Sequence, residues 1–178
     1  LALLRRQVGR LPHRRIDLYK RYMDTIIENW VEARSHGERE HIIRMTDPHE
    51  AESLLIPLAF WLQSTQPSGT ASKADIQKAL TDIYLQEDGF DPATAPRTQK
   101  KSAEERSQQF LADMREMSGI IVERGYDAFG FLHLTFQEYF AGRALAQMEP
   151  ETRWTAIAHH LHDPRWREPI LLCAGQLG

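Results

Sequence analysis

Apolar residues recur every three to four positions along most of the chain, which is the spacing of helices that bury one face. The first such stretch predicts a helix that opens at Leu11-Pro12, where a proline in the first turn does no harm. This helix is expected to run to about Ser35, with Gly37 as its stop.

Capping patterns predict where the next two helices begin. Asp47, with Glu50 three residues later, predicts the start of one helix, and the turn-forming residues 66–69 predict its end. Ser72 and Asp75 predict the start of the following helix in the same way.

Residues 87–101 contain two prolines that disfavour helix, and they are interpreted as an exposed loop. Ser102 and Glu105 then predict the cap of a helix that reaches about residue 118. Near the end of the chain, helical spacing predicts a short helix over 152–161 and a last one over 168–177.

A change of pattern follows residue 118. A short β-rich run at 120–123, a turn at 125–128 and a second run at 129–132 predict a hairpin. The chain therefore reads as mainly α with one short β-hairpin, and the order helix, helix, hairpin, helix is that of a winged-helix domain.

The second strand ends at His133 and turns at once into a helix. Thr135 and Glu138 have the spacing of a capping box at its start. The free N–H groups and the dipole of a helix N-terminus favour an anion beside His133. Position alone does not assign that role, because a histidine at a strand end is more often a hydrogen-bonded structural residue.

Composition fits a chain that buries a core. Charged residues make up 26% and hydrophobic residues 42%, and no apolar run approaches the roughly 20 residues of a membrane span. The net charge of −3 gives no footprint for nucleic acid, and the single cysteine, Cys173, fits a cytoplasmic protein. Both ends look cut from a longer protein, since the chain opens without methionine in what reads as a helix already under way.

Motifs for catalysis are missing from the sequence. It has no glycine-rich phosphate loop with its lysine, and no strand ending in clustered acids for magnesium. Neither a nucleophile elbow nor a histidine partner recommends Cys173 as a nucleophile, so we interpret it as a small core residue. The chain is therefore not expected to be an enzyme by itself.

Two clusters of charged or titratable residues can each be interpreted either as an ordinary solvated surface or as a functional site. In the histidine-rich stretch 159–163 only His159 and His162 have ligand spacing on one helix face, so surface histidines at a helix end are favoured over a metal site. The arginines near the start are favoured as a solvated face over a surface that contacts a phosphate-bearing or acidic partner domain. They are Arg5, Arg6, Arg10, Arg14 and Arg15.

Three patches of the sequence together resemble the NACHT module of STAND-type NTPases. They are Leu11-Pro12 with a following Leu18-Tyr19 and a distal Trp30; the run 131–141, which includes His133, Thr135, Gln137 and Glu138; and the weaker run 166–172. The run 131–141 is the most specific of the three. The resemblance spans nearly the whole chain, and the run 166–172 looks like the start of the helical region that follows the module in bacterial members.

The resemblance implies a domain plan. Residues 1–86 would be the helical subdomain, 87–101 a linker, 102–150 the winged helix, and 151–178 the start of a helical sensor region. His133 would contact a phosphate of the bound nucleotide, with Thr135, Gln137 and Glu138 supporting the motif.

The family's behaviour implies a regulatory lid over the nucleotide. ADP, or ATP with Mg, would be held in the parent protein against the missing phosphate-loop subdomain, and the lid would control autoinhibition and homo-oligomerisation. The parent would be a nucleoside triphosphatase in bacterial anti-phage defence, with downstream sensor repeats. The chain alone is expected to bind no nucleotide strongly.

Two rival functions remain open. One is a DNA-binding winged helix, which a gel shift at low salt would detect, although acidic residues interrupt the basic ones on the predicted recognition helix. The other is a helical scaffold that binds protein through the arginine-rich face. A pull-down against the missing nucleotide-binding half, with and without ADP, would distinguish it.

Overall fold

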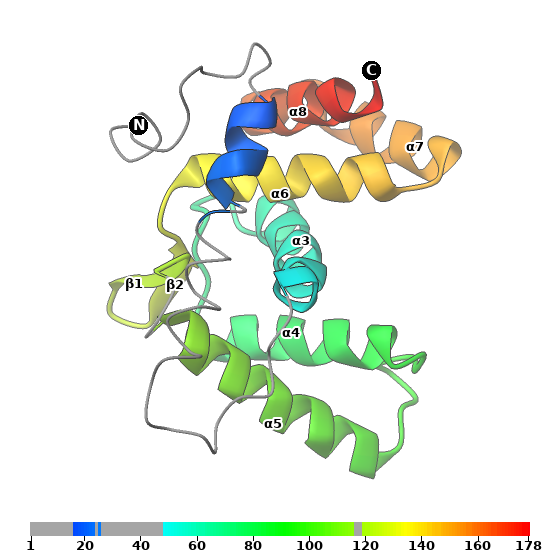
Figure 1. Cartoon of the computed structure of the whole chain (residues 1–178). Coiled ribbons are helices and arrows are strands. Elements are labelled where there is room, and N and C mark those ends of the chain that lie inside the picture. Colours follow the sequence, from blue (N-terminus) through cyan, green and yellow to red (C-terminus); the bar gives the residue numbers. More distant parts are fainter. Residues whose placement is uncertain (1–15, 24, 26–47, 116–118) are drawn as a thin grey trace.

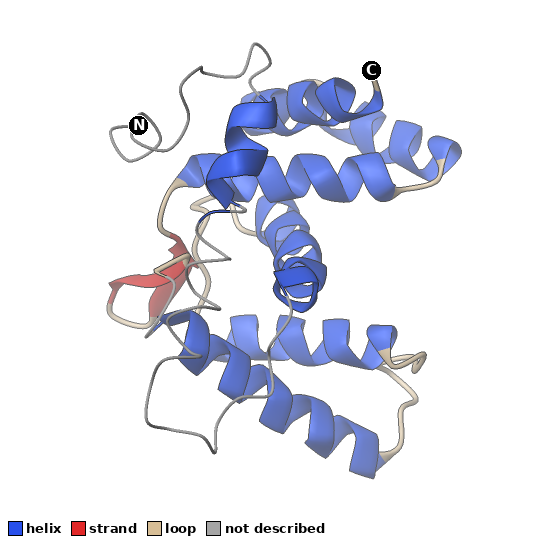
Figure 2. Cartoon of the chain, viewed as in Figure 1, coloured by secondary structure: helices blue, strands red, loops and turns tan. Residues whose placement is uncertain are grey.

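The computed structural model describes residues 16–23, 25, 48–115 and 119–178. Helices dominate this part, and two strands form one antiparallel hairpin (Figure 2), so the predicted mainly α class with a single short hairpin is confirmed. The predicted caps at Asp47 and Glu50, the stop at Gly37 and the arginines at 5–15 lie outside the residues whose side chains are described.

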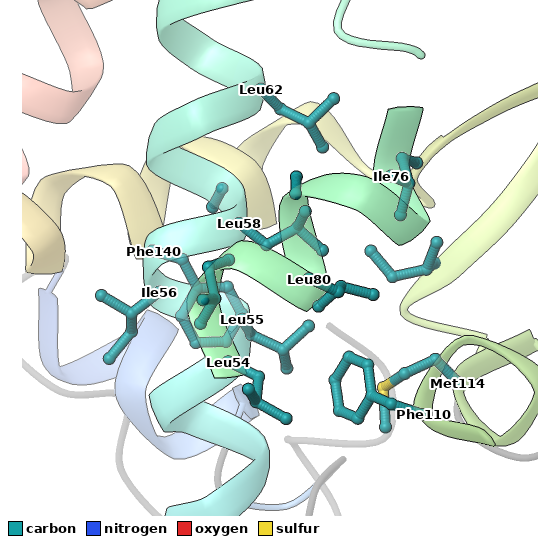
Figure 3. Packing of buried hydrophobic residues seen from close by; sticks show 14 of the residues in the cluster. Leu54, Leu55, Ile56, Leu58, Leu62, Ile76, Leu80, Phe110, Met114 and Phe140 are labelled. Atoms are coloured by element: carbon teal, nitrogen blue, oxygen red, sulfur yellow. The ribbon is translucent and has the colours of Figure 1, made fainter. Parts of the chain in front are cut away.

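Helix α3 (Pro48–Thr65) occupies the centre of the molecule and is seen nearly end-on in Figure 1. Helix α6 (Leu134–Gln147) lies on one side of it, and helix α4 (Lys73–Glu87) lies on the other. Leucines repeat along α3 at spacings that place side chains on both of these sides, and they are buried. They are Leu54, Leu55, Leu58 and Leu62 (Figure 3).

Helix α4 begins where the sequence predicts. The Ser72 hydroxyl oxygen accepts a hydrogen bond from the Asp75 backbone N–H at 3.1 Å and donates to the Asp75 carboxylate at 2.7 Å. This reciprocal pair satisfies one of the free N–H groups of the first turn. The preceding turn at residues 66–69 also forms as predicted, with Gly69 in the left-handed region at φ 70°.

Helix α5 (Arg97–Asp113) begins five residues before the predicted cap, so the capping role of Ser102 and Glu105 and a loop reaching residue 101 are both wrong. Pro96 is the N-cap and has an extended backbone, φ −57° and ψ 148°, which leads into a helix without strain. The turns before it are not fully exposed, because Ala95 is buried and Phe90 packs against the core.

Strands β1 (Ile121–Gly125) and β2 (Ala128–Phe131) pair with Ile121 opposite Phe131, and the register shifts next to the turn. An isolated antiparallel bridge joins Ala71 to β2. Ala71 and Phe129 exchange two backbone hydrogen bonds of 2.9 and 2.8 Å. Helix α3, Ala71, α4, α5 and the hairpin thus follow one another as in a winged helix, with the hairpin as the wing.

Three C-terminal elements complete the described fold. They are helix α7 (Pro150–His160), the 3₁₀ turn η2 (Pro164–Trp166) and helix α8 (Arg167–Leu177), close to the predicted ranges. Helix α8 lies along α6, and the helical residues 16–23 cross α6 near its start (Figure 1). There Tyr19 meets Tyr139 at 6.1 Å between ring centroids, and Tyr22 meets Phe136 at 5.5 Å.

One large cluster of buried residues draws on α3, α4, α5, the hairpin, α6 and α8. It includes residues of both predicted ranges 1–86 and 102–150, so the two share a core, and their division into separate subdomains stays a prediction. No helix formed by the described residues is both long and apolar enough to cross a lipid bilayer.

Candidate functional site

His133 lies at the junction between β2 and α6, as the sequence predicts. It is the N-cap residue of α6, with an extended backbone at φ −123° and ψ 134°. Its carbonyl oxygen accepts a hydrogen bond from the Phe136 N–H at 3.0 Å. The imidazole is exposed and stands edge-on to the Phe136 ring, with 5.2 Å between centroids and 79° between planes. This contact packs the ring against the core while the residue as a whole stays exposed.

The capping box predicted from Thr135 and Glu138 is wrong. Helix α6 begins at Leu134, so Thr135 already lies inside the first turn, and the N-cap is His133. The His133 side chain accepts no capping hydrogen bond from the helix. The N-cap side chain thus supplies no acceptor to the first turn of α6, and a helix N-terminus favours an anion.

Four consecutive exposed residues form what we call the His133 edge, residues 132–135. Leu132 and Leu134 flank the histidine and are 42% and 54% exposed, which is high for leucine. The Arg124 guanidinium donates to the Leu132 carbonyl oxygen at 2.7 Å and ties this edge to β1. The edge combines a hydrogen-bonding imidazole, a helix N-terminus and apolar flanks.

Gln137 and Glu138, the other predicted motif residues, follow the His133 edge along α6. Glu138 is half-buried. Gln137 is 2% exposed, and its side-chain amide donates to the Gln63 side-chain oxygen at 2.7 Å. The Gln63 amide in turn donates to the backbone carbonyl oxygen of Arg165 at 2.7 Å. A buried pair of amides thus joins α6, α3 and η2.

A groove of 770 Å³ is lined by residues of α3, α4 and α6, and none of its lining residues belongs to the His133 edge. Arg143 and Glu52 form a mostly buried ion pair on its wall. Burial alone lowers the pKa of Arg143, but the hydrogen bond and charge of Glu52 outweigh it, so the pKa is raised. The sequence shows Arg143 as the basic residue of its helix, but nothing in the sequence identifies its partner.

The histidines at the end of α7 are engaged with protein groups. His160 stacks on Trp166 with 4.0 Å between centroids and 7° between planes, and its ring lies 6.1 Å from that of His159. Asp163 caps η2 by accepting from the Arg165 backbone N–H and guanidinium, and these hydrogen bonds lower the pKa of its carboxyl. Among the described residues, no group of three or more His, Cys, Asp or Glu could hold a metal ion.

Cys173 is 1% exposed and belongs to a small cluster with Leu145 and Trp166. Burial raises the pKa of its thiol, and the nearby charge of Arg153 opposes that rise. A protonated, buried thiol is a poor nucleophile. This environment agrees with the interpretation of Cys173 as a core residue.

Helix α5 would be the recognition helix of a DNA-binding winged helix, yet several of its cations contact acidic or aromatic groups. Arg106 bonds Asp88 at 2.7 Å and covers the Tyr84 ring at 4.1 Å. Lys101 lies 3.9 Å from Glu105 on the same helix face. This mixed surface disfavours a row of phosphates.

Comparison with known proteins supplies one match. The model of the family described as "Winged helix-turn-helix domain C-terminal to NACHT" matches residues 15–145. No curated protein and no solved structure gave a match. The matched range contains the winged-helix elements, the His133 edge and most of α6.

Proposed function

The chain belongs to the family of winged helix-turn-helix domains C-terminal to NACHT, and from this premise we propose that it is the regulatory lid of a nucleotide switch. The domain is non-catalytic on its own. In the parent protein the His133 edge faces the nucleotide-binding subdomain, and the His133 imidazole hydrogen-bonds a phosphate oxygen of bound ADP.

The position of His133 is the observation that carries this proposal. The imidazole is exposed, its ring contacts Phe136, and His133 is the N-cap residue of α6. Both the imidazole and the helix N-terminus can donate to anionic oxygen. The exposed Leu132 and Leu134 supply an apolar border that a partner subdomain could cover.

The energy of one such contact suits a switch. A hydrogen bond to a charged group contributes about 1.5–3 kcal/mol, and about 1.4 kcal/mol shifts an equilibrium tenfold. If the contact exists only in the closed state, ADP favours that state by at least this factor. The lid thereby keeps the protein closed while ADP is bound.

The wider setting of the proposal rests on the family resemblance. ADP, or ATP with Mg, is held mainly by the upstream subdomain, and exchange of the nucleotide releases the lid and permits homo-oligomerisation. The residues after 150 lead into a helical sensor region, and the biological role is anti-phage signalling in the bacterial cytoplasm.

The decisive experiment measures ADP binding to the parent protein, with its upstream half present, by calorimetry. We expect His133→Ala to weaken ADP binding at least tenfold. His162→Ala is the matched control, because His162 is also exposed but lies beyond α7. Both variants should keep the wild-type circular dichroism spectrum.

Unchanged ADP affinity in His133→Ala, with the fold intact, would overturn the phosphate contact. Equal weakening in His133→Ala and His162→Ala would assign the loss to a general effect of removing a surface histidine.

A further inference from the structure

We propose that Gln63 and Gln137 are positioning residues that link the first turn of α6, and with it the His133 edge, to the η2 turn ahead of α8. The three groups form a continuous path: the Gln137 amide to the Gln63 oxygen, and the Gln63 amide to the Arg165 carbonyl, each at 2.7 Å. The two glutamines are 74 residues apart in the sequence, so this link is tertiary.

The direction of each hydrogen bond in this path is determined. A backbone carbonyl oxygen can only accept, so Gln63 must present its NH₂ group to Arg165. Its oxygen then faces Gln137, which must donate. Reversing either amide would bring two donors or two acceptors together in a buried place, so each glutamine fixes the orientation of the other.

Burial makes the link costly to break. Gln63 and Gln137 are 3% and 2% exposed, so water cannot readily replace a lost partner. An unpaired buried amide keeps its desolvation penalty, and we expect the attached element to shift so that water can reach the amide. A displacement of η2 would therefore displace the first turn of α6 as well.

The η2 turn is otherwise attached to α3 by an aromatic contact. Trp166 is fully buried, and its ring meets Phe60 edge-on at 5.5 Å. The Trp166 Nε1 atom is buried without a hydrogen-bond partner among the described residues. Polar attachment of this turn to α3 is thus supplied through Gln63, which makes Gln63 the residue whose loss should separate the two regions.

Amide hydrogen exchange of this chain, followed by mass spectrometry, tests the link. The Arg165 and Trp166 amides are both hydrogen-bonded to Asp163, so their exchange reports opening of the η2 turn. We expect Gln137→Met to accelerate exchange over residues 163–167 about tenfold, although Gln137 reaches that turn only through Gln63. Reciprocally, Gln63→Met should accelerate exchange in the first turn of α6.

Ser107→Ala is the matched control. Ser107 is 1% exposed, and its hydroxyl accepts a part-buried hydrogen bond of 3.1 Å from the Thr81 hydroxyl, which joins α4 and α5. Its loss should accelerate exchange in α4 and α5 while leaving residues 163–167 at the wild-type rate. A loss of global stability would instead raise the exchange rates of α4 and α5 and of residues 163–167 equally.

Acceleration confined to the mutated helix, or a uniform increase along the whole chain, would overturn the link. The link bears on control by the nucleotide only through the proposed role of His133, on which that part of the inference rests. The exchange experiment uses no nucleotide, so a negative result would remove the link without touching the ADP proposal, and unchanged ADP binding in His133→Ala would leave the link in place.

Discussion

His160 lies flat against the buried Trp166, at 4.0 Å between ring centroids. Its pKa is lowered mainly by burial, and further by the charges of His159 and Arg165, while Asp163 acts in the opposite direction. Because the native state holds this proton less tightly than the unfolded chain, protonation favours unfolding. The stability that the neutral His160 ring contributes is fully present above the unfolded pKa of about 6.5. This stability is lost as the pH falls below that value and toward the lower folded pKa.

We therefore expect His160 to contribute to a fall in the free energy of unfolding between pH 7.5 and pH 5.5. His160→Gln should show a smaller fall, although the lost ring contact costs about 0.5–1.5 kcal/mol at pH 7.5. Urea denaturation at the two pH values measures both quantities. His162→Gln, at an exposed position, should keep the wild-type pH dependence, and an unchanged dependence in His160→Gln would refute this assignment.

Two capping patterns of the same spacing had different outcomes at the residue scale. Ser72 and Asp75 form the predicted cap, whereas Thr135 is already the second residue of its helix. Both patterns are local, but the start of α6 depends on where β2 ends. That end is set by the pairing of Phe131 with Ile121 on the other strand, which no local pattern contains.

Helices α6 and α8 approach each other closely at Gly142. A Cβ atom there would lie 2.8 Å from the Pro169 carbonyl oxygen and 3.0 Å from the Leu172 Cβ. Backbone atoms cannot give way as the end of a flexible side chain can. The contact therefore depends on the absence of a side chain at this position.

Gly142→Ala should destabilise the protein by about 1–3 kcal/mol, because the strain of overpacking exceeds the helix propensity that alanine gains. Gly175→Ala is the helical control: its Cβ would meet Ile16 at 3.8 Å, an ordinary contact, so stability should be unchanged or rise by up to about 1 kcal/mol. Thermal denaturation compares the two. Equal melting temperatures would show that α6 and α8 can separate without cost.

The elements themselves were largely predictable, and their partners were not. Helical spacing found α3, α4 and the C-terminal helices within a few residues, because burial of one face leaves a periodic pattern. The start of α5 is less predictable, because Pro92 and Pro96 disfavour helix by local pattern although a proline just before a helix is well tolerated.

At the scale of the whole molecule, Phe60 joins two buried clusters. It packs against the large core and also against the smaller cluster of Leu145, Trp166 and Cys173. The C-terminal helices are thus fastened to the winged-helix unit by an apolar contact as well as by the glutamine pair. We infer that the described part folds as one cooperative unit.

Urea unfolding should consequently show a single transition, with coincident midpoints by far-ultraviolet circular dichroism and by tryptophan fluorescence. Phe60→Ala should lower both midpoints together, by a free energy of about 2–4 kcal/mol for a partly buried phenylalanine. Leu177→Ala, at an exposed position, should leave them unchanged. An early fluorescence change that precedes the loss of helix would show that the chain does not unfold as one cooperative unit.

What the sequence alone could not supply at this scale were contacts between distant residues. The pairing of Arg143 with Glu52, and that of Gln137 with Gln63, depend on how α3 and α6 cross. His133 could be placed at its junction from local pattern, but the exposure of its flanking leucines follows from the completed core.

The wing turn has a further consequence for the handling of this protein. Tyr126 is fully exposed at the turn, where an aromatic residue would ordinarily invite cleavage by a chymotrypsin-like protease. Its neighbour Asp127 has φ 51°, and its carboxylate accepts a hydrogen bond from the Lys73 backbone N–H at 3.1 Å. The backbone N–H and carbonyl oxygen of Phe129 both form hydrogen bonds with the backbone of Ala71. A protease must extract several residues of extended backbone, which here means opening the start of α4 as well. The most exposed aromatic side chain described in the molecule therefore sits on a peptide that should resist digestion as long as the domain stays folded.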